Sequence, residues 1–226
     1  MNPPVYHRMF GYDVARLPNA HLASLERGVS CIEDARPRTG ATIGYPGWGF
    51  IYHLLLSHLD RNRKEVLIET GTNEGCTTII LAQALVDAGV KGHVHTFELE
   101  ETNIAKARQN LELGGVADRV TLHQGSVHDT FGPALKDLGK VRFAFLDASH
   151  LVKDVMFEFE TLLPYLTPDA IVLFDNTYRI AEPHEDQRVN GALGVILEKH
   201  GGNLINLEHV SWFTPGLAMW QRKPKL

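Results

Sequence analysis

The chain has 226 residues, 44% of them hydrophobic, and a formal net charge of −5. This length and composition suit one globular domain with a well-buried core, and the absence of an apolar stretch at the start favours a cytoplasmic protein. The acidic balance argues against nucleic acid and membranes as partners, since both call for clustered lysine and arginine. A small molecule is the expected partner.

The first 60 residues contain proline- and glycine-rich stretches and lead into a predicted helix at residues 50–59. We expect residues 1–60 to form an N-terminal helical cap over the cofactor edge of a domain that spans residues 61–226. This cap and an exposed C-terminal hairpin are compatible with a homodimer.

From residue 65 onward, short β-branched runs alternate with segments whose apolar residues recur at helical spacing, which is typical of βαβ units. The predicted strands span residues 66–70, 93–98, 120–124, 141–147 and 170–175, followed by a hairpin of 203–212 and 217–222. The predicted helices span residues 77–88, 103–113, 131–138, 152–163 and 189–199, and the apolar stripe of 152–163 indicates core packing. The pattern predicts a doubly wound, Rossmann-like α/β sheet of five parallel strands plus a C-terminal antiparallel hairpin, seven strands in all.

The segment from Glu69 to Gly75 follows the first predicted strand, where a doubly wound sheet binds its ligand. Gly71 permits a sharp turn and close approach of a ligand, while Gly75 lets the next helix start near the sheet. The segment has neither glycine pattern of a phosphate cradle, which disfavours NAD and ATP. Glu98 ends the second strand, where a carboxylate can accept hydrogen bonds from ribose hydroxyls. Both acids could instead be solvated strand-end residues, but together they indicate an adenosine site.

A second polar group follows the fourth and fifth strands: Asp147 with His150, and Asp175 with Asn176. Because neighbouring strand ends lie about 5 Å apart, two carboxylates and an amide oxygen can converge there. Such oxygen donors suit Mg²⁺, Mn²⁺ or Ca²⁺, and a histidine beside them can accept a proton near neutral pH. The alternatives are that Asp147 caps a helix, that Asp175 and Asn176 form an Asx turn, and that His150 is one of twelve incidental histidines.

From about residue 65 to 178 the chain resembles class I S-adenosylmethionine-dependent methyltransferases, in particular metal-dependent O-methyltransferases of the catechol and caffeoyl-CoA type. The resemblance implies S-adenosylmethionine as cofactor and a divalent metal, Mg²⁺ foremost. The implied cofactor residues are Glu69, Gly71, Gly75, Thr77, Glu98, Ser126, Val127 and Asp147, and the implied metal ligands are Asp147, Asp175 and Asn176. The two aspartates are 175 − 147 = 28 positions apart, an interval like that of catechol methyltransferases.

One position departs from the catechol pattern, because His150 stands where those enzymes carry a catalytic lysine. An Asp-x-x-His pairing resembles O-methyltransferases of antibiotic biosynthesis, although their second metal position tends to be a pair of acids. We therefore predict metal-assisted methyl transfer to a small-molecule hydroxyl, phenolic or on a natural-product sugar, with His150 and Asp147 as catalytic residues. Trp48, Tyr178, Trp212 and Trp220 are candidates for the wall of the acceptor pocket, against a simple packing role.

Two other functions stay open. One is a methyltransferase-like domain that binds the cofactor without transferring methyl, as a scaffold or as a catalyst of another reaction. The other is an NAD(P)-dependent oxidoreductase, against which the missing third glycine and the absence of a Tyr-x-x-x-Lys pair argue.

Overall fold

The computed structural model describes residues 13–40, 42–177, 188–207 and 216–223. Its seven-stranded sheet has the order β3-β2-β1-β4-β5-β7-β6, with β1 to β5 parallel and β7 antiparallel to both β5 and β6. The strands are β1 (Lys64–Thr70), β2 (Lys91–Glu98), β3 (Val120–Gln124), β4 (Val141–Leu146), β5 (Leu166–Asp175), β6 (Asn203–Leu207) and β7 (Leu217–Gln221). The predicted Rossmann-like sheet with its C-terminal hairpin is confirmed.

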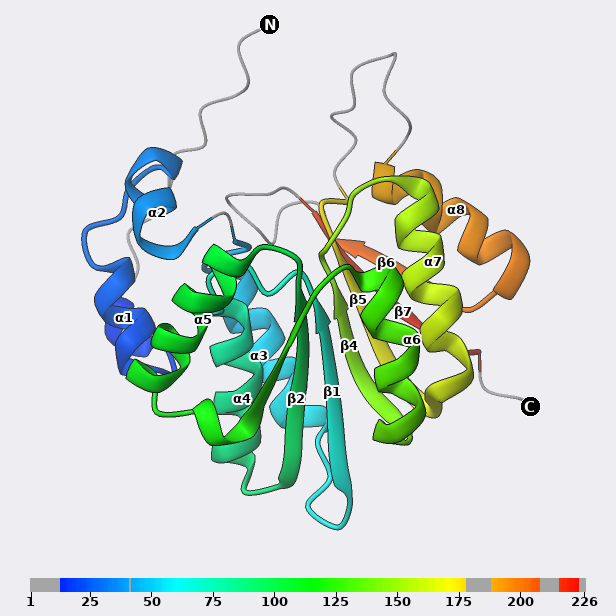
Figure 1. Cartoon of the computed structure of the whole chain (residues 1–226), viewed down its shortest axis with the longest axis horizontal. Coiled ribbons are helices and arrows are strands. Elements are labelled where there is room, and N and C mark those ends of the chain that lie inside the picture. The colour runs from blue at the N-terminus through cyan, green and yellow to red at the C-terminus, as the bar shows by residue number, and fades with distance from the viewer. Residues whose placement is uncertain (1–12, 41, 178–187, 208–215, 224–226) are drawn as a thin grey trace, which may run out of the picture.

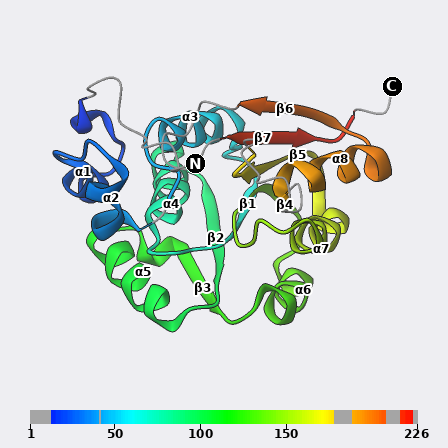
Figure 2. The same ribbon diagram turned by 90° about the horizontal axis from the view of Figure 1, so that it is seen from above.

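Helices cover both faces of this sheet (Figures 1 and 2). The described helices are α1 (Ala20–Glu26), α2 (Ile32–Thr39), α3 (Gly47–His58), α4 (Cys76–Ala88), α5 (Glu101–Leu113), α6 (Val127–Leu138), α7 (Val152–Leu162) and α8 (Arg188–His200). The group α3, α4 and α5 lies on one face, and α6, α7 and α8 lie on the other. No described helix is long and apolar enough to cross a membrane.

Two separate buried clusters form the core, one on each face of the sheet. On the first face, Trp48 and Ile51 of α3 belong to the same cluster as Ile80 of α4. On the second face, Phe159 of α7 and Trp220 of β7 are both fully buried. Their rings pack edge to face with their centroids 4.9 Å apart. Burial on both faces explains why the central strands read as continuous apolar runs rather than as alternating patterns.

Several element boundaries differ from the sequence prediction. β5 begins at Leu166 rather than at residue 170, because Leu166 already pairs with Val141 before a register shift in the β4–β5 ladder. α6 begins at Val127, where the Ser126 hydroxyl oxygen accepts a hydrogen bond from the His128 amide at 3.2 Å. β6 ends at Leu207, and the predicted continuation of the hairpin through residues 208–215 lies outside the described residues.

Candidate active site

The turn after β1 lies against the loop after β4, and this contact requires a glycine. Gly71 has φ +82°, and a Cβ there would lie 2.2 Å from the Asp147 carbonyl oxygen. The amides of Gly71 and Thr72 both donate to the Phe97 carbonyl of β2, at 2.9 and 3.1 Å. The predicted sharp turn is therefore present, and it joins the carboxyl ends of three neighbouring strands.

Gly75 has a different neighbour from the one predicted. It precedes α4 with φ +83°, but the atoms that a Cβ would meet belong to Ala107 of α5, at 3.1 to 3.2 Å. The absent side chain therefore permits close packing of two helices rather than an approach of helix to sheet.

Glu98 is held in place by the backbone at the carboxyl end of β2. Its Oε2 accepts from the Asn73 amide at 2.7 Å, and its Oε1 accepts from the Glu100 amide at 2.9 Å. The side chain is only 8% exposed, and each oxygen retains a second lone pair. A carboxylate fixed in this way can accept hydrogen bonds from two neighbouring hydroxyls, as predicted for a ribose.

Two small hollows open at this end of the sheet, and Gly71, Glu98 and Ala148 line both of them. The first, about 220 Å³, is called the Ser126 hollow, and its lining includes Ser126 and Val127, the two residues expected beside the adenine. The second, about 260 Å³, is called the Asp147 hollow, and the structure brings the predicted acid–amide set together in its wall. Its remaining lining residues are Thr42, Asn73, Asn103, Asp147, His150, Asp175 and Asn176.

The two aspartates of the Asp147 hollow lie within hydrogen-bonding reach of each other. Burial, reinforced by the negative charges of Glu69 and Glu158, raises the pKa of Asp147 well above its usual range, and the contact with Asp175 opposes that rise. Two carboxyl groups this close either share a proton or stay ionised together only when a cation lies between them. Among the described residues, however, no group of three or more His, Cys, Asp or Glu side chains is arranged to hold a metal ion.

His150 stands beside this pair, with its Nε2 3.7 Å from Asp147 Oδ1 and its side chain 39% exposed. Partial burial is the main cause that lowers the pKa of His150, and the nearby Arg188 acts in the same direction, whereas Asp175 opposes it. The imidazole is therefore neutral at neutral pH and has a nitrogen that can accept a proton.

Like Gly75, the predicted cofactor residues Glu69 and Thr77 line neither hollow. Glu69 is fully buried, and its Oε2 accepts from the hydroxyls of Thr78 at 2.5 Å and Thr96 at 2.6 Å, while its Oε1 has no partner. Burial raises the pKa of Glu69 to about 7. The Thr77 hydroxyl lies 3.1 Å from Trp48 Nε1, which donates to it, and 3.1 Å from the Thr42 hydroxyl.

Glu158 is a site residue that the sequence prediction missed. It belongs to the α7 face that we assigned to packing, is 2% exposed and lines the Ser126 hollow. Its Oε2 accepts from the Thr70 hydroxyl at 2.5 Å, and that hydroxyl oxygen in turn accepts from the Asp147 amide at 3.2 Å. Burial raises the pKa of Glu158 to about 8. The sequence signal that could have revealed Glu158 is its place three residues after Val155, which puts an acid on the buried side of an amphipathic helix.

The aromatic residues do not form the predicted pocket wall where they are described. Trp48 is buried against α4, and Trp220 is buried against α7, where its Nε1 donates to the Gly201 carbonyl at 2.8 Å. Both therefore have packing roles. Tyr178 and Trp212 lie outside the described residues.

The segment that contributes most of the residues of both hollows is similar to a known family. Residues 68–177 match the family Methyltransf_24, described as a methyltransferase domain. The matched segment, about half of the chain, is therefore similar to a methyltransferase domain. It includes the end of β1 and the whole of β2, β4 and β5, and the carboxyl ends of these strands carry the turn, Glu98 and the acid–amide set.

The domain is also similar to individual proteins. It is 33% identical over 113 residues to a catechol O-methyltransferase of Mycobacterium tuberculosis, a match that covers 50% of this chain and about half (48%) of that relative's length.

Two solved structures share the fold over nearly the whole chain. An O-methyltransferase from Bacillus cereus in complex with SAH has a TM-score of 0.72 and 22% identity, covering 96% of this chain and 94% of its own. TomG, an O-methyltransferase from Streptomyces achromogenes involved in tomaymycin synthesis, in complex with SAM, has a TM-score of 0.72 and 20% identity, with 91% of each chain covered.

Proposed function

We propose that this chain is an S-adenosylmethionine-dependent O-methyltransferase that acts on a hydroxyl group of a small molecule. The observation that carries the proposal is that Glu98, fixed by two backbone amides, lines both the Ser126 hollow and the Asp147 hollow. A nucleoside held by Glu98 therefore has its far end beside the acid–amide set and His150. The similarity of residues 68–177 to a methyltransferase domain, and of 113 residues of the chain to a catechol O-methyltransferase, supports the same cofactor and reaction.

The Asp147 hollow also fits a divalent metal ion. Asp147, Asp175 and Asn176 offer oxygen donors, the kind that Mg²⁺ prefers, and a cation would relieve the repulsion between the two neighbouring carboxyl groups. When bound there, the ion would polarise the acceptor hydroxyl and favour loss of its proton. This part of the proposal rests on donor chemistry.

The chain's own residues would then position the reactants and remove one proton. Nε2 of His150 would accept the proton of the substrate hydroxyl, and S-adenosylmethionine, when bound, would supply the methyl group to that oxygen and leave as S-adenosylhomocysteine. The hydrogen bonds from the Asn73 and Glu100 amides keep Glu98 in place throughout, so little reorganisation is required. A phenolic hydroxyl or a hydroxyl of a natural-product sugar is the proposed acceptor.

The test is a methyl-transfer assay by mass spectrometry with a panel of phenols and sugars, S-adenosylmethionine and Mg²⁺, before and after treatment with EDTA. We expect turnover that EDTA abolishes and Mg²⁺ restores. His150→Ala should lower kcat by about 10² or more while the Kd for the cofactor stays within twofold, and His53→Ala, an exposed histidine of α3, serves as the matched control.

Each failure of this assay has a separate meaning. Turnover that survives complete metal removal would refute the metal role of Asp147, Asp175 and Asn176. An unchanged kcat in His150→Ala would remove the proposed base. Binding of S-adenosylmethionine without transfer to any acceptor would favour a scaffold or another reaction instead.

A further inference from the structure

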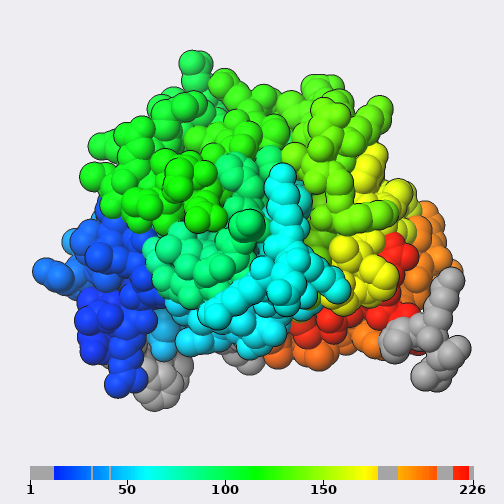
Figure 3. Space-filling model, turned by 90° about the horizontal axis from the view of Figure 1, so that it is seen from below, coloured from blue at the N-terminus to red at the C-terminus, as the bar shows by residue number. Residues whose placement is uncertain are grey.

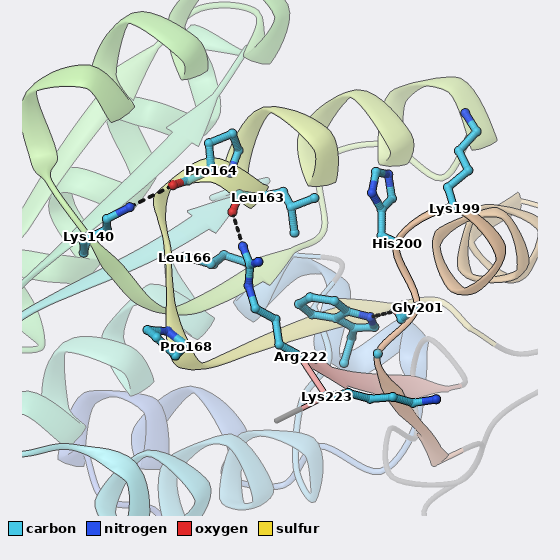
Figure 4. Close-up of a pocket in the computed structure, with 12 residues that line it drawn as sticks. Lys140, Leu163, Pro164, Leu166, Pro168, Lys199, His200, Gly201, Arg222 and Lys223 are labelled. Atoms are coloured by element: carbon cyan, nitrogen blue, oxygen red, sulfur yellow. Dashed lines mark hydrogen bonds between the residues drawn. The ribbon is translucent and has the colours of Figure 1, made fainter. Parts of the chain in front are cut away.

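A larger cavity lies at the other end of the sheet, away from both hollows. It has a volume of about 1030 Å³ and is bounded by the start of β5, the end of α8 and the residues after β7 (Figure 4). Figure 3 shows this end of the molecule, where the yellow, orange and red segments meet. Because parallel strands carry the methyl-transfer residues at their carboxyl ends, this cavity belongs to a different surface of the domain.

The lining of this cavity is strongly basic. Lys140, Lys199, Arg222 and Lys223 contribute to it together with His200, and its lining residues include no aspartate or glutamate. The whole chain has a net charge of −5, so the cluster runs against the overall charge. Four cations gathered around one recess repel one another, and an anion bound among them would relieve that repulsion. We call this recess the basic cavity.

Two of the cations are held on the wall of the basic cavity by the backbone of the short turn Leu163–Tyr165. Lys140 Nζ donates to the Pro164 carbonyl at 2.9 Å, and Arg222 donates to the Leu163 carbonyl at 2.6 Å (Figure 4). These bonds fix both charges without neutralising them, because a carbonyl carries no net charge. Each side chain keeps further N–H donors for a ligand.

Lys199 and His200 at the end of α8 share one acidic neighbour among the described residues. Glu160 Oε1 lies 3.8 Å from Lys199 Nζ and 3.1 Å from His200 Nε2, and the charge of Lys199 also complements the carboxyl end of α8. Lys223 has no ion-pair partner in the part of the chain that the structure describes. One carboxylate therefore offsets only a fraction of the positive charge.

The recess is built into the packed structure and is more than a set of surface lysines. Trp220, 1% exposed, forms part of its lining and donates through Nε1 to the Gly201 carbonyl. A Cβ at Gly202 would lie 2.1 Å from that same Nε1, so the backbone there is pressed against the indole ring. The shape of the cavity therefore depends on close contacts that fix its wall.

We infer that the basic cavity binds a small polyanion, specifically an organic compound that carries a di- or triphosphate group. Lysine and arginine donors suit phosphate oxygens, and the volume matches a compound of nucleotide size. A recess confined to one end of the sheet in an acidic chain favours a small molecule over nucleic acid, which would need an extended basic stripe. Since the cavity lies at the opposite strand ends, such a ligand should bind together with S-adenosylmethionine.

The experiment is isothermal titration calorimetry of the full chain with tripolyphosphate and with ATP, in low salt, with and without S-adenosylmethionine. We expect saturable binding of both anions that S-adenosylmethionine leaves unchanged. Lys223→Gln should raise the Kd for both anions about fivefold, which corresponds to the loss of one exposed charge pair. The double charge reversal Lys199→Glu/Lys223→Glu should abolish anion binding. Lys91→Gln, an exposed lysine at the start of β2, is the matched control and should bind as the wild type does.

Four results would overturn the inference. The first is that millimolar tripolyphosphate does not bind, and the second is that the wild type and the double variant bind it equally. The third is that Lys91→Gln weakens binding as much as Lys223→Gln does, which would indicate diffuse surface charge. The fourth is competition by S-adenosylmethionine, because the anion would then occupy the strand-end hollows. Circular dichroism of the double variant verifies that it is folded before the titration is interpreted.

Discussion

The buried carboxyl group of Glu158 should make the stability of the ligand-free protein fall as pH rises. Its pKa is about 8 in the folded protein against an ordinary value of 4.5. Between these two values the unfolded chain has released the proton of Glu158 and the folded chain has kept it. The folded state therefore binds more protons, so the stabilisation is complete below pH 4.5 and is lost as pH rises through about 8.

The magnitude follows from the same two values. Each pH unit within this window changes the contribution of Glu158 by about 1.4 kcal/mol, so the interval from pH 5.5 to 7.5 changes it by about 3 kcal/mol. No discount for solvent screening applies, because the side chain is 2% exposed. Glu158→Gln removes the titration yet keeps an oxygen that can accept from the Thr70 hydroxyl.

Urea unfolding of the wild type and of Glu158→Gln at pH 5.5, 6.5 and 7.5 measures this effect. The difference in the free energy of unfolding should shift by about 3 kcal/mol in favour of the variant across the series. Glu112→Gln, an exposed glutamate of α5, is the control and should run parallel to the wild type. A constant difference between Glu158→Gln and the wild type at all three values would refute the reasoning.

Three further substitutions test other parts of the structure. Gly71→Ala places a Cβ 2.2 Å from a backbone oxygen and should abolish cofactor binding measured by calorimetry. Its control is Gly115→Ala, which is also at positive φ but in open space. The control should lower the free energy of unfolding by only about 1 kcal/mol and leave cofactor binding intact. Glu98→Gln loses the charge that two amides stabilise and should raise the Kd for S-adenosylmethionine about tenfold or more, and an unchanged Kd would exclude its role. Arg142→Met leaves the fully buried Glu65 without its 2.6 Å partner and should lower the free energy of unfolding by about 3–5 kcal/mol at pH 7, so a loss below 1 kcal/mol would contradict a structural role for this pair.

The sheet could be predicted because its strands are short, β-branched and separated by helical periodicity, and because strand ends in such a sheet meet at one edge. That rule predicts from the sequence alone that Glu98, Asp147 and Asp175 lie at the same edge of the sheet. The rule applies to this protein because the register of the parallel strands brings the ends of β2, β1, β4 and β5 side by side.

Local patterns were a poorer guide where tertiary contacts decide the outcome. The role of Gly75 depends on Ala107, which is 32 residues away in sequence, and the start of β5 depends on its pairing with Val141. Glu158 was hidden in an apolar helical stripe, because a single acid within such a stripe gives no indication of which hollow it reaches. The sequence predicts a helical cap at the N-terminus but not the bounds of α1 and α2. One reason is that α2 contains Pro37, and a proline within a segment argues against a helix there.

Calorimetric titration of the purified chain with S-adenosylmethionine, S-adenosylhomocysteine and NAD tests the central claim most directly, because it asks which nucleoside the strand-end hollows accept. We predict saturable binding of the first two at one site per chain, weakened in Glu98→Gln, and no heat of binding with NAD. Binding of NAD without binding of S-adenosylmethionine would contradict the proposed methyltransferase.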